Sequence, residues 1–170
     1  MHPHRPDHWL HAAVEVRPSP IAGRGLFARA PIAAGTVVAR LGGRLVDDAG
    51  LRAAFADADG YVDTIVVDAG RHLLLAPGGD IRFANHACDP NLGWADEYTL
   101  VATSGIAGGD ELTSDYSTST VDADWVLRCH CPSTRCRQMV TGEDWRIPQL
   151  QQRYAGWWPP YLQRLIDGSA

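Results

Sequence analysis

Four cysteines are the residues of this 170-residue sequence whose type and spacing most clearly indicate chemistry. Cys129, Cys131 and Cys136 form the pattern C-x-C-x4-C in "CHCPSTRC", and Cys88 lies upstream. Four thiolates complete the shell of a closed tetrahedral zinc site. The alternatives are unligated core thiols or a redox pair, but a C-x-C pair cannot easily close a relaxed disulfide, and the turn before the last cysteine is polar. We therefore predict one structural zinc ion bound by these four cysteines, with His130 outside the shell.

Two further segments concentrate polar side chains. "RFANHACDPN", at residues 82–91, brings guanidinium, amide, imidazole, thiol and carboxylate groups together in a chain otherwise rich in Ala, Gly, Val and Leu. "GDELTSDY", at residues 109–116, ends on a tyrosine. These polar residues also have purely structural interpretations: Arg82 as a surface charge, and Asn85, Asp89 and Asn91 as turn formers around Pro90. Together the two segments are candidates for a binding or catalytic site.

Composition and charge restrict the class of protein. A chain of this length with 45% hydrophobic residues buries one core, which predicts a single domain with small appendages. The formal net charge of −5 argues against a surface that binds nucleic acid through its phosphates, and suits a basic partner such as a cationic peptide. No run of about eighteen apolar residues is present, and the N-terminus "MHPHRPDHWLH" has no apolar signal core. We therefore expect a cytoplasmic protein without a membrane span.

Two other patterns invite a functional interpretation that the surrounding residues argue against. Four of the seven histidines fall within the first eleven residues, but they are mixed with prolines and are typical of a solvated tail. "GRGLFA" at residues 23–28 matches the dinucleotide fingerprint, with Asp47 as a candidate ribose ligand. That fingerprint requires a helix to begin at the glycines, and Pro31 and Gly35 interrupt the segment. We expect these glycines to form a turn or to permit a close backbone approach.

The hydrophobic pattern predicts a β-rich α+β fold. A helix is expected from Asp47 or Asp48 to a stop at Gly60, and two short helices should begin at Pro148 and Pro160. Short β-branched runs bounded by glycine and proline predict strands at residues 13–16, 36–41, 62–68, 72–76 and 98–103.

The order of these motifs resembles the SET-domain protein lysine methyltransferases with a cysteine-rich post-SET zinc segment, and in particular a small bacterial-type member. "GRGLFA", "RFANHACDPN" and "GDELTSDY" are followed by the cysteines, and the resemblance covers about residues 13–145. It implies a SET fold of small curved sheets, with a pseudoknot that places the second and third motifs side by side. The implied divisions are a flexible N-terminal tail, a SET domain, a post-SET segment and a C-terminal helical tail, at residues 1–12, 13–117, 118–142 and 143–170.

The resemblance also implies a cofactor site for S-adenosylmethionine. By this resemblance Asn85 and His86 hold the amino group and the adenine, and Arg82 contacts the carboxylate. Arg24 and Gly25 offer turn backbone near the same end of the cofactor. The segment at residues 82–91 would then bind the cofactor and, through Cys88, also contribute to the zinc site.

Three aromatic residues complete the implied site. Tyr116 matches the family's active-site tyrosine, whose hydroxyl lies near the transferring methyl and the amine, and Tyr61 matches a second aromatic position near the cofactor or the lysine channel. Trp145 follows the cysteines and either stacks on the adenine or packs the tail together with Trp157 and Trp158. Tyr116 also has a structural alternative, as a core tyrosine at a strand end.

The implied activity is transfer of methyl groups to the ε-amine of a lysine in a protein or basic peptide. Ser114 stands where many family members carry Phe or Tyr, which predicts room for a di- or trimethylated product. A catalytically silent SET-fold module that binds a partner tail is the alternative, and retention of Asn85, His86 and Tyr116 argues against it. A redox-sensing zinc switch with reactive thiols is a third reading. The sequence names neither the substrate protein nor the oligomeric state.

Overall fold

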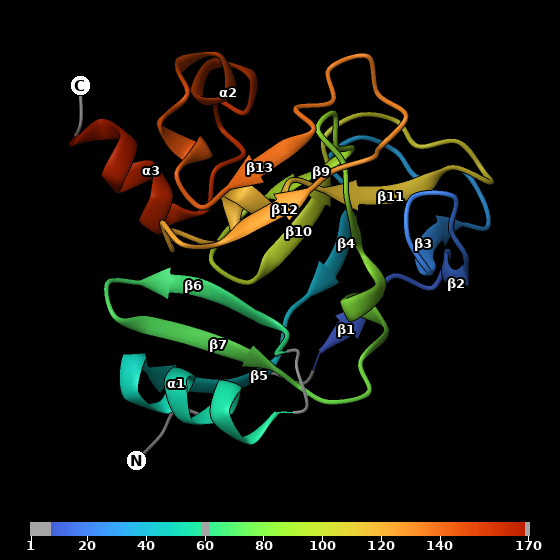
Figure 1. Cartoon of the computed structure of the whole chain (residues 1–170). Coiled ribbons are helices and arrows are strands. Elements are labelled where there is room, and N and C mark those ends of the chain that lie inside the picture. The colour runs from blue at the N-terminus through green and yellow to red at the C-terminus, as the bar shows by residue number, and fades with distance from the viewer. Residues whose placement is uncertain (1–7, 59–61, 169–170) are drawn as a thin grey trace.

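The computed structural model describes residues 8–58 and 62–168. In this part of the chain, short strands form small separate sheets, and helices are few and short (Figure 1). This β-rich α+β architecture is the one that the sequence predicts. One sheet has the order β1-β4-β10-β9, with strands Trp9–Leu10, Val37–Arg40, Thr99–Ala102 and Leu92–Trp94.

A second sheet brings the polar motifs together. Its order is β2-β3-β11-β8, with strands Val14–Pro18, Arg24–Ala28, Glu111–Ser114 and Asn85–His86. β8 and β11 pair in parallel, with Asn85 opposite Thr113 and His86 opposite Ser114. The two motifs therefore lie side by side, as the resemblance implies.

The segment that resembles a dinucleotide motif is an ordinary strand. Residues 24–28 form β3, which pairs antiparallel with β2 along its whole length, so no helix begins at the glycines. Gly23 precedes the strand with φ +47°, a left-handed conformation that glycine adopts without steric cost. The expectation of a turn at this glycine is confirmed.

A third sheet, of order β5-β7-β6, carries the first helix. Its strands are Gly43–Asp47, Arg71–Leu75 and Thr64–Asp68. Helix α1, Asp48–Asp57, lies along β5 and β7 (Figure 1). Asp47 caps it, because its carboxylate accepts the backbone N–H of Gly50 at 2.8 Å. The predicted stop at Gly60 lies outside the described residues.

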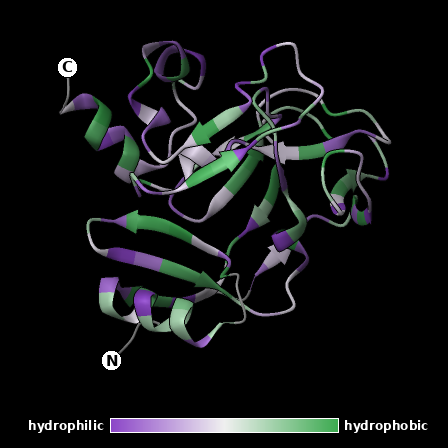
Figure 2. Cartoon of the chain, viewed as in Figure 1, coloured by the Kyte–Doolittle hydropathy of each residue, from purple (hydrophilic) through white to green (hydrophobic). Residues whose placement is uncertain are grey.

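The main core lies where the sheets face one another. Leu26, Leu73 and Leu112 come from three different strands and are fully buried, and burial of each contributes about 1.5–3 kcal/mol to folding. Figure 2 shows mainly hydrophobic residues along β4, β6 and β10. None of the described helices is long and apolar enough to cross a membrane.

The C-terminal segment packs as an integral part of the fold. After the two-stranded sheet β12-β13, Val126–Arg128 with Met139–Thr141, the chain forms the 3-10 turn η3, Asp144–Arg146, and then α2, Pro148–Arg153, and α3, Pro160–Asp167. Both helices begin at the predicted prolines. Their apolar side chains form a cluster with Val66 of β6, made of Trp145, Leu150, Tyr154, Trp158 and Leu162. This set is called the tail cluster below.

Candidate functional site

The side chain of Asn85 is fixed by residues at the start of β3 and by Glu111 of β11. Its Nδ2 donates to the carbonyl oxygens of Ala22 at 3.2 Å and Arg24 at 3.0 Å, and to Glu111 Oε1 at 2.8 Å. These three acceptors settle which side-chain atom is nitrogen. Within residues 8–58 and 62–168, no donor reaches Oδ1 of Asn85. The amide oxygen is therefore available to a ligand that donates hydrogen bonds.

Glu111 supports Asn85 and was not singled out by the sequence analysis. Its two carboxylate oxygens accept from Ser19 Oγ at 2.8 and 2.9 Å, and Oε1 also accepts from Asn85. A side chain at Gly25 would overlap Glu111 Oε1, so only glycine leaves room for this carboxylate. The signal was present, because Glu111 is part of "GDELTSDY" and Gly25 is part of "GRGLFA".

Two arginines place positive charge near this amide. The guanidinium carbons of Arg24 and Arg82 lie 4.6 and 4.8 Å from the ring centroid of Phe83, and both arginines are exposed. Arg24 is also the residue whose carbonyl accepts from Asn85. The structure therefore brings together four of the predicted cofactor residues: Arg24, Gly25, Arg82 and Asn85.

The His86 side chain is used within the protein. It is 4% exposed, and its Nδ1 accepts the backbone N–H of Tyr116 at 3.1 Å. Nε2 therefore carries the proton and donates to Cys88 Sγ at 3.4 Å. Burial lowers the pKa of His86 against the opposing effect of Asp115, which agrees with a neutral ring. Any contact of His86 with a ligand would thus come from its backbone.

Tyr116 is held at both ends. It opens the 3-10 turn η2, Tyr116–Thr118, its N–H is bound by His86, and its hydroxyl donates to the carbonyl oxygen of Ala84 at 2.8 Å. Ser114, two residues earlier, is half-buried and pairs with His86 across the parallel ladder. Tyr116, the predicted catalytic tyrosine, thus lies two residues after the end of β11, the strand that pairs with the strand of Asn85.

The four cysteines form one compact cluster. Their sulfur atoms lie within 4.8 Å of one another, and Cys88 Sγ is 3.8 Å from Cys129 Sγ. A tetrahedral metal site with bonds of about 2.3 Å requires sulfur separations near 3.8 Å. All four thiols are free of disulfides, and His130 is exposed and outside the cluster. The cluster can therefore hold a metal ion.

The chemistry around the sulfur atoms also suits a cation. Burial raises the pKa of the Cys88 and Cys129 thiols, so ionising the set needs a compensating positive charge. Backbone N–H groups of Cys131 and Arg137 point at Cys129 Sγ and Cys88 Sγ, at 3.4 and 3.3 Å. Such donors stabilise thiolates that a metal has already formed.

A buried acid links this cluster to the tail. Asp115 is 2% exposed and accepts both terminal nitrogens of Arg137 at 2.7 and 2.8 Å, and the Tyr154 hydroxyl at 2.8 Å. Burial alone would raise the pKa of Asp115, yet the Arg137 guanidinium holds that pKa below its usual value. Arg137 Nε also lies 3.2 Å from Asp144 Oδ2, close enough for an ion pair though not aligned as a hydrogen bond. None of these partners was predicted from the sequence.

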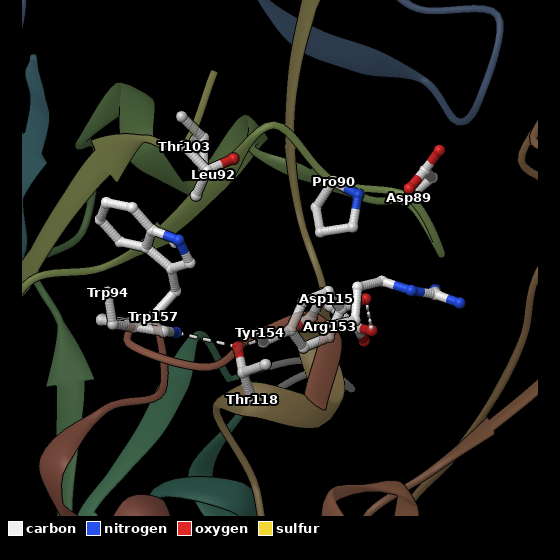
Figure 3. Close-up of a pocket in the computed structure, with 11 residues that line it drawn as sticks. Asp89, Pro90, Leu92, Trp94, Thr103, Asp115, Thr118, Arg153, Tyr154 and Trp157 are labelled. Carbon is white, nitrogen blue, oxygen red and sulfur yellow. Dashed lines mark hydrogen bonds between the residues drawn. The ribbon is translucent and has the colours of Figure 1, made fainter. Parts of the chain in front are cut away.

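A cavity of about 260 Å³ lies beside this acid (Figure 3). Figure 3 shows Asp115 and Tyr154 on one side of it and Trp157 and Pro90 on others. Its lining comprises Asp89, Pro90, Leu92, Gly93, Trp94, Thr103, Asp115, Thr118, Arg153, Tyr154 and Trp157. None of the predicted cofactor residues is among them.

Of the other two predicted residues, one packs in the C-terminal segment and one cannot be placed. Trp145 is 5% exposed and belongs to the tail cluster, with the Arg146 guanidinium 4.5 Å from its ring centroid. This position fits the alternative in which Trp145 packs the tail, and its cofactor role stays a prediction. Tyr61 lies outside the described residues.

Comparison with known proteins identifies the family. A profile of the SET domain matches residues 23–117. The chain belongs to the SET domain family. This chain is 35% identical over 144 residues to human "Histone-lysine N-methyltransferase 2B". It is 29% identical over 143 residues to "Histone-lysine N-methyltransferase ash1" of Drosophila melanogaster. Each alignment covers 75% of this chain but only 5% and 6% of the relative, so the chain spans a small part of their length.

A solved structure confirms the fold. The methyltransferase domain of human "Histone-lysine N-methyltransferase SETMAR" superposes with a TM-score of 0.61. The match covers 76% of this chain and 58% of that one, at 20% sequence identity. The SET fold that the sequence predicts is therefore the fold of this chain.

The contact between Gly25 and Glu111 predicts a position-specific stability loss. Gly25→Ala should displace the Glu111 carboxylate and lower the free energy of unfolding by about 1–3 kcal/mol, as measured by denaturant titration. Gly105→Ala is the matched control, because a Cβ there meets nothing within 4 Å and should change stability by less than about 0.5 kcal/mol. Equal effects of the two substitutions would contradict this account of Gly25.

Proposed function

We propose that this SET-family chain transfers methyl groups from S-adenosylmethionine to the ε-amine of a lysine in a protein. The observation that carries the proposal is the free amide oxygen of Asn85, together with the exposed guanidinium groups of Arg24 and Arg82. Both guanidinium groups lie over the ring of Phe83, two residues before Asn85. An α-amino acid group has an ammonium that donates to an amide oxygen and a carboxylate that pairs with arginine. S-adenosylmethionine carries such a group, so these residues fit it. The names of the relatives support the same activity.

The reaction requires positioning more than acid or base chemistry. When bound, S-adenosylmethionine supplies a methyl group activated by a sulfonium. A lysine amine, with a pKa near 10.4 in water, must lose its proton before it attacks, and a desolvating channel favours the neutral form. Tyr116 then orients the amine, because its backbone is fixed by His86 and its hydroxyl is held at the Ala84 carbonyl. Alignment of this kind supplies most of the rate gain in such displacements.

Two features bear on the substrate and the product. The net charge of −5 favours a basic protein or peptide as the methyl acceptor. Ser114, in the strand that leads to Tyr116, has a small side chain where many family members carry an aromatic one. We infer that an amine already carrying one or two methyl groups is accepted, so that the product is di- or trimethyl-lysine.

The cysteine cluster is proposed to bind one structural zinc ion. Four thiolates with no open coordination position are typical of structural rather than catalytic zinc. The ion would join Cys88, in the asparagine-bearing motif, to the segment that contains Cys129, Cys131 and Cys136. Zinc binding would thus connect the post-SET segment to the segment proposed to bind the cofactor.

Metal analysis tests this assignment. Freshly purified protein should carry about one zinc per chain, and removal of zinc by a chelator should lower the melting temperature, because the folded state loses a ligand that the unfolded chain does not retain. Cys88→Ser should lose the metal, whereas His130→Ala should keep it. Protein that holds no zinc without exposure to chelator would contradict the assignment.

Substitution of the tyrosine tests the proposed reaction. Tyr116→Phe should lower kcat by about tenfold or more with little change in the Kd of S-adenosylmethionine, because the hydroxyl acts at the reacting centre. Tyr98→Phe, in a tyrosine that packs on the main core, is the control and should leave kcat unchanged. Mass spectrometry of the acceptor reports the number of methyl groups added. Undiminished turnover in Tyr116→Phe would exclude the proposed role.

A further inference from the structure

Residues at the end of α2, in the C-terminal tail, contact the polar motifs at residues 82–91 and 109–116. Tyr154, which follows α2, is 8% exposed, and its hydroxyl donates to Asp115 Oδ2 at 2.8 Å. Its neighbour Arg153 donates to the carbonyl oxygen of Cys88 at 3.2 Å. One end of one helix therefore contacts both the segment that carries Asn85 and the segment that carries Tyr116 (Figure 3). Tyr154 lies outside residues 23–117, which the SET profile matches.

Asp115, the acid that Tyr154 contacts, caps the turn that begins at Tyr116. Asp115 directly precedes Tyr116 and caps η2, since its Oδ1 accepts the N–H of Ser117 at 3.0 Å and the Ser117 hydroxyl at 2.8 Å. The capping contact needs one orientation of the carboxylate. Rotation of the Asp115 side chain would remove both Ser117 contacts from the turn that starts at Tyr116.

The carboxylate has a fixed partner on each oxygen. Arg137 binds both oxygens, Ser117 adds donors to Oδ1, and Tyr154 adds a donor to Oδ2. Without the Tyr154 hydroxyl, Arg137 is the one remaining donor to Oδ2 among the described residues. Tyr154 is itself immobilised by the tail cluster, where its ring centroid lies 5.6 Å from that of Trp158. It is therefore a rigid anchor for the acid.

We propose that Tyr154 is a positioning residue for methyl transfer, which holds the Asp115 carboxylate in the orientation that places Tyr116. This inference rests on the proposed function of Tyr116. In this contact the Tyr154 hydroxyl is the donor and the Asp115 carboxylate is the acceptor. The C-terminal tail would then contribute to the site through Asp115.

Kinetics of a hydroxyl deletion test the proposal. In the zinc-loaded full chain, with S-adenosylmethionine and purified core histones as acceptor, Tyr154→Phe should lower kcat roughly tenfold, the effect of losing one hydrogen bond to a buried charge. The KM for the acceptor and the Kd of S-adenosylmethionine should stay within about twofold, because neither binding surface changes. Tyr161→Phe is the matched control: it removes a hydroxyl from a half-buried tyrosine of the same tail and should leave kcat unchanged.

Amide hydrogen exchange gives a second readout that needs no turnover. The Ser117 amide should exchange faster in Tyr154→Phe than in wild type or Tyr161→Phe, because its acceptor is no longer fixed, while amides of β10 should not change. Unchanged Ser117 exchange, or unchanged kcat in an active enzyme, would overturn the proposal. If wild type transfers no methyl group but Ser117 exchange still rises in Tyr154→Phe, the proposed function fails while the positioning of Tyr116 by Tyr154 stands.

Discussion

The buried ion pair between Asp115 and Arg137 is the interaction on which the site depends. Moving a carboxylate out of water costs several kcal/mol, and only well-aligned donors offset that cost. Arg137 supplies two parallel N–H donors, and Ser117 and Tyr154 supply three more. Asp115 belongs to the SET motif, Arg137 to the cysteine segment and Tyr154 to the C-terminal tail. One carboxylate therefore requires three separate parts of the chain to meet.

The cysteine cluster and the ion pair support one another. Arg137 follows Cys136, and its backbone N–H points at Cys88 Sγ. A metal ion in the cluster would hold Arg137 against Asp115, and loss of the cluster would leave a buried carboxylate without its cation, a defect worth about 3–5 kcal/mol. His86 lies between the two, with one ring nitrogen on Tyr116 and the other on Cys88. A metal ion in the cluster would thus be linked to the backbone of Tyr116 through His86.

Local patterns predicted the parts of the fold that local interactions determine. Strands β2, β4, β6, β7 and β10, the capped helix and the helices that begin at Pro148 and Pro160 follow from alternation, capping and proline geometry, whereas β3 and β5 were not predicted. Strands β8 and β9 have two and three residues and carry no readable alternation. Their pairing is set by contacts between distant segments, so no local pattern predicted them, and only the family resemblance implied that β8 lies beside β11.

Some residues of the candidate site could likewise be predicted from the sequence, and others could not. The cysteines were predictable because their type and spacing are specific, and the family resemblance located Asn85 and Tyr116. The partners of Asp115 were not predictable, because a single arginine or tyrosine many residues away has no sequence signature. Contacts of this kind depend on the three-dimensional fold, and they involve the C-terminal tail, where the family motifs offer no guide.

A double-mutant cycle on the buried pair tests this account most directly. Asp115→Asn, Arg137→Met and the double variant would be compared by their free energies of unfolding, each with its zinc content measured. We expect each single change to cost about 3 kcal/mol or more, and the double variant to lose less than their sum by more than about 1 kcal/mol. Strictly additive losses would show that Asp115 and Arg137 act independently, and would contradict the claim that this pair joins the SET motif to the cysteine segment.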